Sequence, residues 1–149
     1  MNKLILPNAR FISLPSAQLG QDWFEVCLKL DSALEALNLE LSEEAIYLHY
    51  SLAPALVLEG RGECRVARSV TGPLKNLDGD FKLTDWNQGF VFKFSFSLNS
   101  WESLLSQCYS SWEHLIRENH KIKSAFTVSL RRGLKDSLSN SIEVIFYQG

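Results

Sequence analysis

Alternation of apolar and polar residues along one segment constrains the fold of this chain more than any other feature. Phenylalanine occupies every second position of the run 90–96, and Leu98 continues the pattern. The residues between them are small or polar: Val91, Lys93, Ser95 and Ser97. Side chains alternate between the two faces of a strand, so the four rings line one face. We therefore predict a strand whose aromatic face packs into the core of a sheet protein.

Two segments instead repeat apolar residues at steps of three and four, as amphipathic helices do. The first runs from Asp22, a suitable N-cap, to about Leu39. The second begins at Asn99 or Ser100, and Glu102 follows in its first turn, as in a capping box. Each predicted helix has one apolar face, which the sheet is expected to cover.

Period-two patterns and turn residues outline the remaining strands. The predicted ranges are 45–52, 56–70 with a break at Gly60 and Gly62, 81–86, 124–131 and 141–147, with an edge strand near 3–6. The residues Ser42-Glu43-Glu44 also fit the start of a helix, which leaves the segment 45–52 open to a second interpretation. Segments 81–86 and 90–98 are joined by Asn87-Gln88-Gly89 and predict a hairpin.

Together these elements predict one α+β domain over residues 1–149, with a mostly antiparallel sheet of five to seven strands packed by two amphipathic helices. The chain has 149 residues, of which 46% are apolar, and this is enough to bury a sizeable core without a disulfide or a metal. No internal repeat is visible in the sequence.

The cysteines point to buried thiols. There are three, an odd number, and no two are close in sequence, which argues against disulfides and metal motifs. His114 and Glu118 lie four residues apart, but zinc needs three or four ligands, so we expect no metal and no cofactor. The first apolar run is interrupted at Pro7, and no run approaches the ~18 residues of a membrane span. We expect a cytoplasmic protein without membrane contact.

Charge is divided along the chain although the formal total is only −2. Segment 22–59 holds eight acidic residues and one basic residue, whereas segment 117–135 holds six basic residues and one acidic residue. Opposed blocks of charge orient partners, although they also suit solvated surfaces. Because no catalytic motif is visible, the blocks favour a non-enzymatic protein-binding module, such as an accessory factor, adaptor, inhibitor or immunity-type protein. The residues predicted to contact a protein partner are Glu40, Glu43, Glu44, Arg117, Lys121, Lys123, Arg131, Arg132 and Lys135.

Two other functions stay open from the sequence. A carrier or sensor of a small lipophilic ligand would use the aromatic strand face as a pocket wall, formed by Phe90, Phe92, Phe94, Phe96 and Arg68. An enzyme acting on an anionic substrate would use Arg65, Arg68 and Arg131. The slightly negative net charge gives no reason to expect a nucleic-acid partner.

Overall fold

The computed structural model describes residues 1–73, 77–97, 100–131 and 142–149, and these contain eight strands and three helices. The strands are β1 Asn2–Leu6, β2 Ala9–Pro15, β3 Glu40–Tyr50, β4 Cys64–Thr71, β5 Lys82–Trp86, β6 Gly89–Phe96, β7 Ile122–Leu130 and β8 Ile142–Gln148. The helices are α1 Trp23–Ala33, α2 Pro54–Leu58 and α3 Trp101–Arg117.

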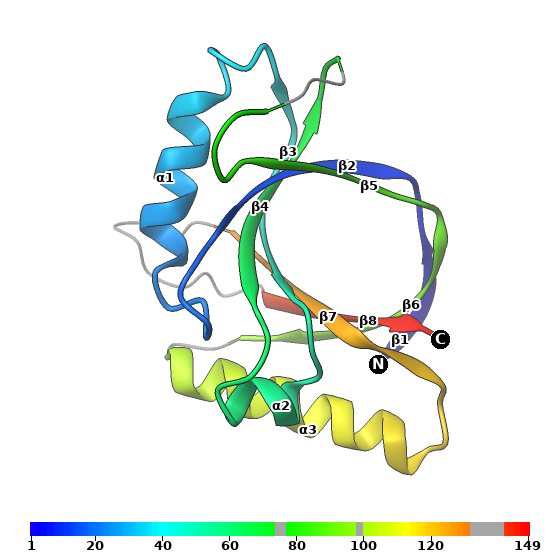
Figure 1. Cartoon of the computed structure of the whole chain (residues 1–149). Helices are drawn as coiled ribbons and strands as arrows, with labels where there is room; N and C mark the ends of the chain where they lie inside the picture. The colour runs from blue at the N-terminus through cyan, green and yellow to red at the C-terminus, as the bar shows by residue number, and fades with distance from the viewer. Residues whose placement is uncertain (74–76, 98–99, 132–141) are drawn as a thin grey trace.

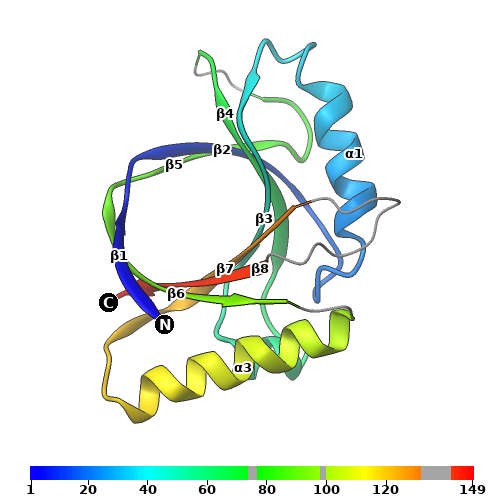
Figure 2. The same ribbon diagram turned by 180° about the vertical axis from the view of Figure 1, so that it is seen from behind.

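All eight strands belong to one antiparallel sheet with the order β1-β6-β8-β7-β3-β4-β2-β5. The sheet curls into a half-barrel, and both views show α1 and α3 on its outer side (Figure 1, Figure 2). The convex face of the sheet is therefore covered by helices, and the concave face is turned inward.

The topology is two-fold symmetric about the β3–β7 pair. Replacing β1, β2, β3 and β4 by β5, β6, β7 and β8 turns one half of the strand order into the other. The first two strands of each half are equally spaced along the sequence, because Asn2 begins β1 and Lys82 begins β5, while Ala9 begins β2 and Gly89 begins β6. Both halves contain the pattern strand, strand, helix, strand, strand, and the first half carries the additional short helix α2 between β3 and β4. The sequence did not reveal this repeat.

Strand parity separates the core from the concave face. Where β3 pairs with β7, over residues 46–50 and 126–130, the even-numbered residues, such as Leu48 and Val128, are fully buried in the core that packs against the helices. Odd-numbered residues of the same strands, such as Tyr47 and Ser129, point to the opposite face because side chains alternate. The same parity holds along β8, so one face of the sheet makes the core and the other lines the concavity.

The predicted fold class is wrong in its number of elements. The described chain has eight strands rather than five to seven, and three helices rather than two. The strand β2 was missed because the adjacent apolar residues Phe11 and Ile12 break the alternation, and because the strand ends at Pro15. The predicted strand 56–70 is two elements, the short helix α2, which has Pro54 in its first turn, and the strand β4.

The predicted hairpin of segments 81–86 and 90–98 is also wrong. Both segments contain strands, but β5 pairs with β2 and β6 pairs with β1 and β8. The residues between them cross from one half of the sheet to the other, and the β1–β2 connection makes the matching crossing. The two crossings meet where the Gln88 backbone N–H donates to Asn8 Oδ1 at 2.5 Å.

The predicted second helix is confirmed, since Ser100 caps α3 by accepting from the Ser103 backbone N–H. The first helix ends at Ala33, earlier than predicted, because a turn follows in which Asn38 has a positive φ of 59°. The predicted edge strand near 3–6 and the two closing strands are confirmed as β1, β7 and β8.

The phenylalanines of β6 test the division into faces. Phe92 is 2% exposed in the core, whereas Phe90 is 50% exposed. We expect Phe92→Ala to lower the free energy of unfolding by about 3–5 kcal/mol, as truncation of a buried ring does. Phe94→Ala should cost less because that ring is only partly buried, and Phe90→Ala should cost least. Urea unfolding of the three variants measures this order, and an equal loss at all three positions would contradict the assignment of faces.

Candidate functional site on the concave face

The concave face holds a cavity of about 380 Å³, here called the central cavity. It lies between the crossing segments of the chain and the middle of the sheet. Its lining mixes apolar and aromatic side chains with four charged ones: Leu6, Pro7, Asn8, Ala9, Phe11, Ser42, Glu43, Ala45, Tyr47, Ser69, Trp86, Lys93, Ser129, Arg131, Glu143 and Ile145. A volume of this size and this mixture of side chains are typical of small-molecule sites.

An aromatic cluster forms one wall of the central cavity. The ring of Phe11 packs edge-on against Tyr47 at 5.1 Å, against His49 at 5.0 Å and against Trp86 at 5.7 Å between centroids. Trp86 in turn meets Tyr147 edge-on at 4.7 Å. Edge-to-face contacts hold rings in fixed orientations, so this wall is preorganised to receive a flat apolar ligand.

The central cavity contains two carboxylates with different partners. Tyr47 Oη donates to Glu43, which lies where β3 and β4 lose register between Leu41 and Ile46. Glu143 Oε2 lies 2.5 Å from Lys93 Nζ. Burial, the hydrogen bond to Glu43 and the charge of Glu143 raise the pKa of Tyr47 well above its usual value. Tyr47 therefore stays protonated and remains a donor.

A chain of polar side chains runs across the concave face beside the cavity. His49 Nδ1 is 2.9 Å from Thr127 Oγ1, which is 2.5 Å from the Tyr147 hydroxyl. Burial, helped by the charge of Arg65, lowers the pKa of His49 to about 4. The imidazole is therefore neutral at pH 7 and orders the Thr127 and Tyr147 hydroxyls without adding charge.

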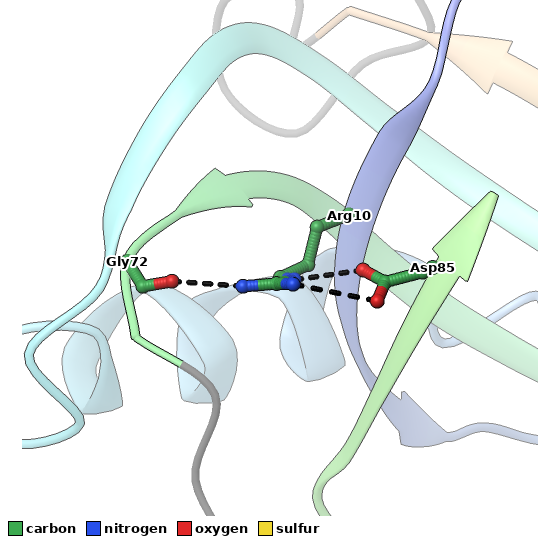
Figure 3. A network of polar contacts seen from close by, with 3 residues as sticks. All are labelled: Arg10, Gly72 and Asp85. Carbon is green, nitrogen blue, oxygen red and sulfur yellow. Dashed lines mark hydrogen bonds and ion pairs between the residues drawn. The ribbon is translucent and has the colours of Figure 1, made fainter. Parts of the chain in front are cut away.

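The position of Trp86 is fixed by an ion pair on the strand that carries it. Arg10 Nε lies 2.7 Å from one oxygen of Asp85 and its Nη2 lies 3.3 Å from the other, while Nη1 donates to the Gly72 carbonyl at 2.9 Å (Figure 3). The hydrogen bonds from Arg10 lower the pKa of Asp85 below its usual value. The three groups tie β5 to β2 and to the end of β4.

Gly72 suits this junction because it has no side chain. Its φ is +145°, and a Cβ at that position would stand 2.7 Å from Leu39 Cδ2 and 3.0 Å from the Asn38 carbonyl oxygen. A larger residue would push the end of β4 away from Arg10, so the contact in Figure 3 depends on glycine.

Trp86 also borders two further hollows on the same side of the molecule. One, of about 560 Å³, lies beside Arg10 and Asp85, and the other, of about 310 Å³, lies beside Phe90 and Tyr147. The Trp86 indole thus borders the central cavity and both hollows.

The residues predicted to bind a protein partner, as far as the structure describes them, come from several elements. Glu43 and Arg131 line the central cavity, and Lys123 borders the 310 Å³ hollow. The others that the structure describes are exposed, with Glu40 and Glu44 in β3, Arg117 paired with Glu113 at the end of α3, and Lys121 just after α3. Arg132 and Lys135 lie outside the described residues.

The predicted aromatic pocket wall faces the helices rather than the central cavity. Phe94 contacts Phe146 and His114 edge-on, Phe92 is buried in the core, and Phe96 packs against that core. Only Phe90 borders a hollow. Arg68, 3% exposed, also lies on the helix-covered face, where its Nε is 3.3 Å from Asp31 Oδ1 and its Nη1 donates to the Glu44 carbonyl.

The residues that build the central cavity were missed because function was sought in the charge blocks, the Phe90–Phe96 face and the arginines, and not in the second face of the other strands. Their signal was present, since aromatic and charged side chains fill odd positions where a solvated strand face usually carries small polar ones. The principal residues missed are Phe11, Tyr47, Trp86, Lys93 and Glu143, which line the cavity, and His49, Thr127 and Tyr147, which lie beside it.

Comparison with known proteins finds likeness in structure. No family model matches the chain, and no curated protein matches it in sequence. The EcmrR chain in a cryo-EM structure of the EcmrR–DNA complex in EcmrR-RPo has a TM-score of 0.76 at 11% identity, covering 98% of this chain and 56% of that chain. The crystal structure of the EcmrR C-terminal domain has a TM-score of 0.66 at 14% identity, covering 99% of this chain and 96% of that chain. The structure of SAV2435 bound to tetraphenylphosphonium has a TM-score of 0.64 at 11% identity, covering 100% of this chain and 94% of that chain.

These likenesses establish the fold, which this chain shares with a domain of EcmrR and with SAV2435. The chain spans about half the length of the EcmrR chain in the DNA complex. The prediction of a protein-binding adaptor, accessory factor or inhibitor is contradicted, because the proteins that share this fold are EcmrR, seen with DNA, and SAV2435, seen with the small molecule tetraphenylphosphonium. The expectation that nucleic acid plays no part is contradicted as well, since one neighbour is seen with DNA. The ligand-sensor alternative agrees better with the findings.

No helix in the part of the chain that the structure describes is long and apolar enough to cross a membrane.

The lowered pKa of His49 predicts how stability depends on pH. Protonation of His49 is disfavoured in the folded state, so between about pH 6.5 and pH 4 the unfolded chain binds the proton more readily. The contribution of the neutral imidazole is therefore complete above pH 6.5 and is lost as the pH falls towards 4. We expect His49→Gln to remove this part of the pH dependence, measured by urea unfolding at a series of pH values. If the free energy of unfolding changes with pH in the same way in the wild type and in His49→Gln, this prediction is wrong.

Proposed function

We propose that this chain is a non-enzymatic, ligand-sensing domain of transcription regulation. The observation that carries the proposal is the central cavity, with its fixed aromatic wall of Phe11, Tyr47 and Trp86 and four charged side chains in its lining. A small aromatic ligand would lie against this wall and place its polar group near Glu43 and Glu143. The neighbours add support, since SAV2435 is seen with the aromatic ion tetraphenylphosphonium and EcmrR with DNA.

The regulatory part of the proposal concerns how ligand occupancy is transmitted. The cavity lies between the two crossing segments, so a ligand that contacts Trp86 and Asn8 touches both halves of the sheet at once. A change in their relative position would reach the helices through the shared core. Contact with DNA would then belong to the regulator as a whole, and the cavity would supply the signal. A cytoplasmic location goes with this proposal.

Binding of an aromatic ligand tests the proposal. We expect at least one compound from a panel of tetraphenylphosphonium and simple indoles to bind, and Trp86→Leu to weaken that binding at least tenfold, because the substitution removes the ring shared by the cavity and the hollows. Trp112→Leu is the matched control, since Trp112 is a partly buried tryptophan of α3 that packs against the core. Dissociation constants come from NMR titration of the purified proteins.

Two results would overturn the proposal. One is a panel in which no aromatic compound of any charge binds. The other is an affinity that Trp86→Leu leaves unchanged while the variant keeps its fold by circular dichroism.

A further inference from the structure

The Lys93–Glu143 ion pair lies inside the central cavity and occupies the place where a ligand's charge would go. Lys93 projects from β6 and Glu143 from β8, and both side chains line the cavity. Lys93 Nζ and Glu143 Oε2 are 2.5 Å apart, and the two side chains are 26% and 30% exposed. This ion pair is therefore partly desolvated. If either side chain loses its partner, water does not fully solvate the charge that remains.

The central cavity is lined by two further charged side chains, Glu43 and Arg131. Glu43 accepts the Tyr47 hydroxyl and lies across the sheet from Lys93. Arg131 is exposed at the end of β7. Counted together, the charged side chains lining the cavity are two acids and two bases, so the cavity as a whole is not acidic.

A ligand with a single charge meets a penalty in such a cavity. A cation that takes the Glu143 carboxylate displaces Lys93 and leaves its ammonium without an acceptor. An anion that pairs with Lys93 leaves the Glu143 carboxylate without a donor. Removing one partner of a partly buried pair costs more than the pair itself contributes, because the remaining charge stays desolvated.

We infer that the central cavity selects aromatic zwitterions, with the ligand's ammonium on Glu143, its carboxylate on Lys93 and its ring against Phe11 and Trp86. Such a ligand replaces the ion pair with two new pairs and leaves no charge alone. Because the two protein charges are adjacent, the ligand's charges must also be adjacent, as they are on the α-carbon of an amino acid. The inference rests on the proposed function and specifies the ligand class of the same cavity.

Indoles of similar size and different charge test this selection directly. The probes are L-tryptophan as the zwitterion, tryptamine as the cation and indole-3-propionate as the anion, each titrated by NMR at pH 7. The wild type is expected to bind tryptophan most tightly. Lys93→Met frees Glu143 and should shift the tryptamine-to-tryptophan affinity ratio at least tenfold towards tryptamine. Glu143→Gln frees Lys93 and should shift the corresponding ratio towards indole-3-propionate.

Two further variants keep the result interpretable. Lys29→Met removes an exposed lysine of α1 and should leave the ranking unchanged. The double variant Lys93→Glu/Glu143→Lys restores an ion pair with the two charges exchanged. It should restore the preference for tryptophan even if the single variants fold poorly.

A wild type that prefers tryptamine or tetraphenylphosphonium, with a ranking that Lys93→Met does not alter, would overturn the inference and leave the proposed function standing. If no probe of any charge binds, both the inference and the proposed function are wrong.

Discussion

The pairing of β3 with β7 is the contact on which the rest of the structure depends. Leu48 faces Val128 at its centre, and the two halves of the fold are related about this point. On one face of the pair lie the fully buried residues of the core, and on the other lie Tyr47 and Ser129 of the cavity. A slip of one residue would exchange the faces and lose both features, so the register that builds the core also builds the site.

The second constraint is the exchange of edge strands between the halves. Since β1 pairs with β6 and β5 pairs with β2, two segments cross the open side of the half-barrel. This brings Trp86 opposite Ala9 and over Phe11, while the Arg10–Asp85 pair holds the strand in place. The aromatic wall of the cavity is therefore a product of topology and needs no element beyond the sheet itself.

Local periodicity in the sequence predicted the closing strands, the helix capped by Ser100 and the burial of the three cysteines. Local periodicity did not predict which strands pair when they are far apart in sequence. The strand that pairs with β5 begins at Ala9, and no pattern near either segment indicates this pairing. The duplication escaped notice because the halves share their topology and spacing rather than their side chains. The site was missed because an alternating strand shows which residues share a face, but a face filled by Tyr47 and His49 reads as exposed until the sheet is seen to curl.

The most direct test of a ligand site on the concave face uses the four tryptophans of the chain. Only Trp86 lines the central cavity, whereas Trp23, Trp101 and Trp112 belong to α1 and α3. Indole N–H signals of ¹⁵N-labelled protein can be followed as unlabelled tetraphenylphosphonium and then L-tryptophan are added. The account predicts that the Trp86 signal moves to a saturating end point and shows the largest change, while the three tryptophans of the helices move less. Movement of the helix tryptophans with a stationary Trp86, or no movement with either compound, would contradict it.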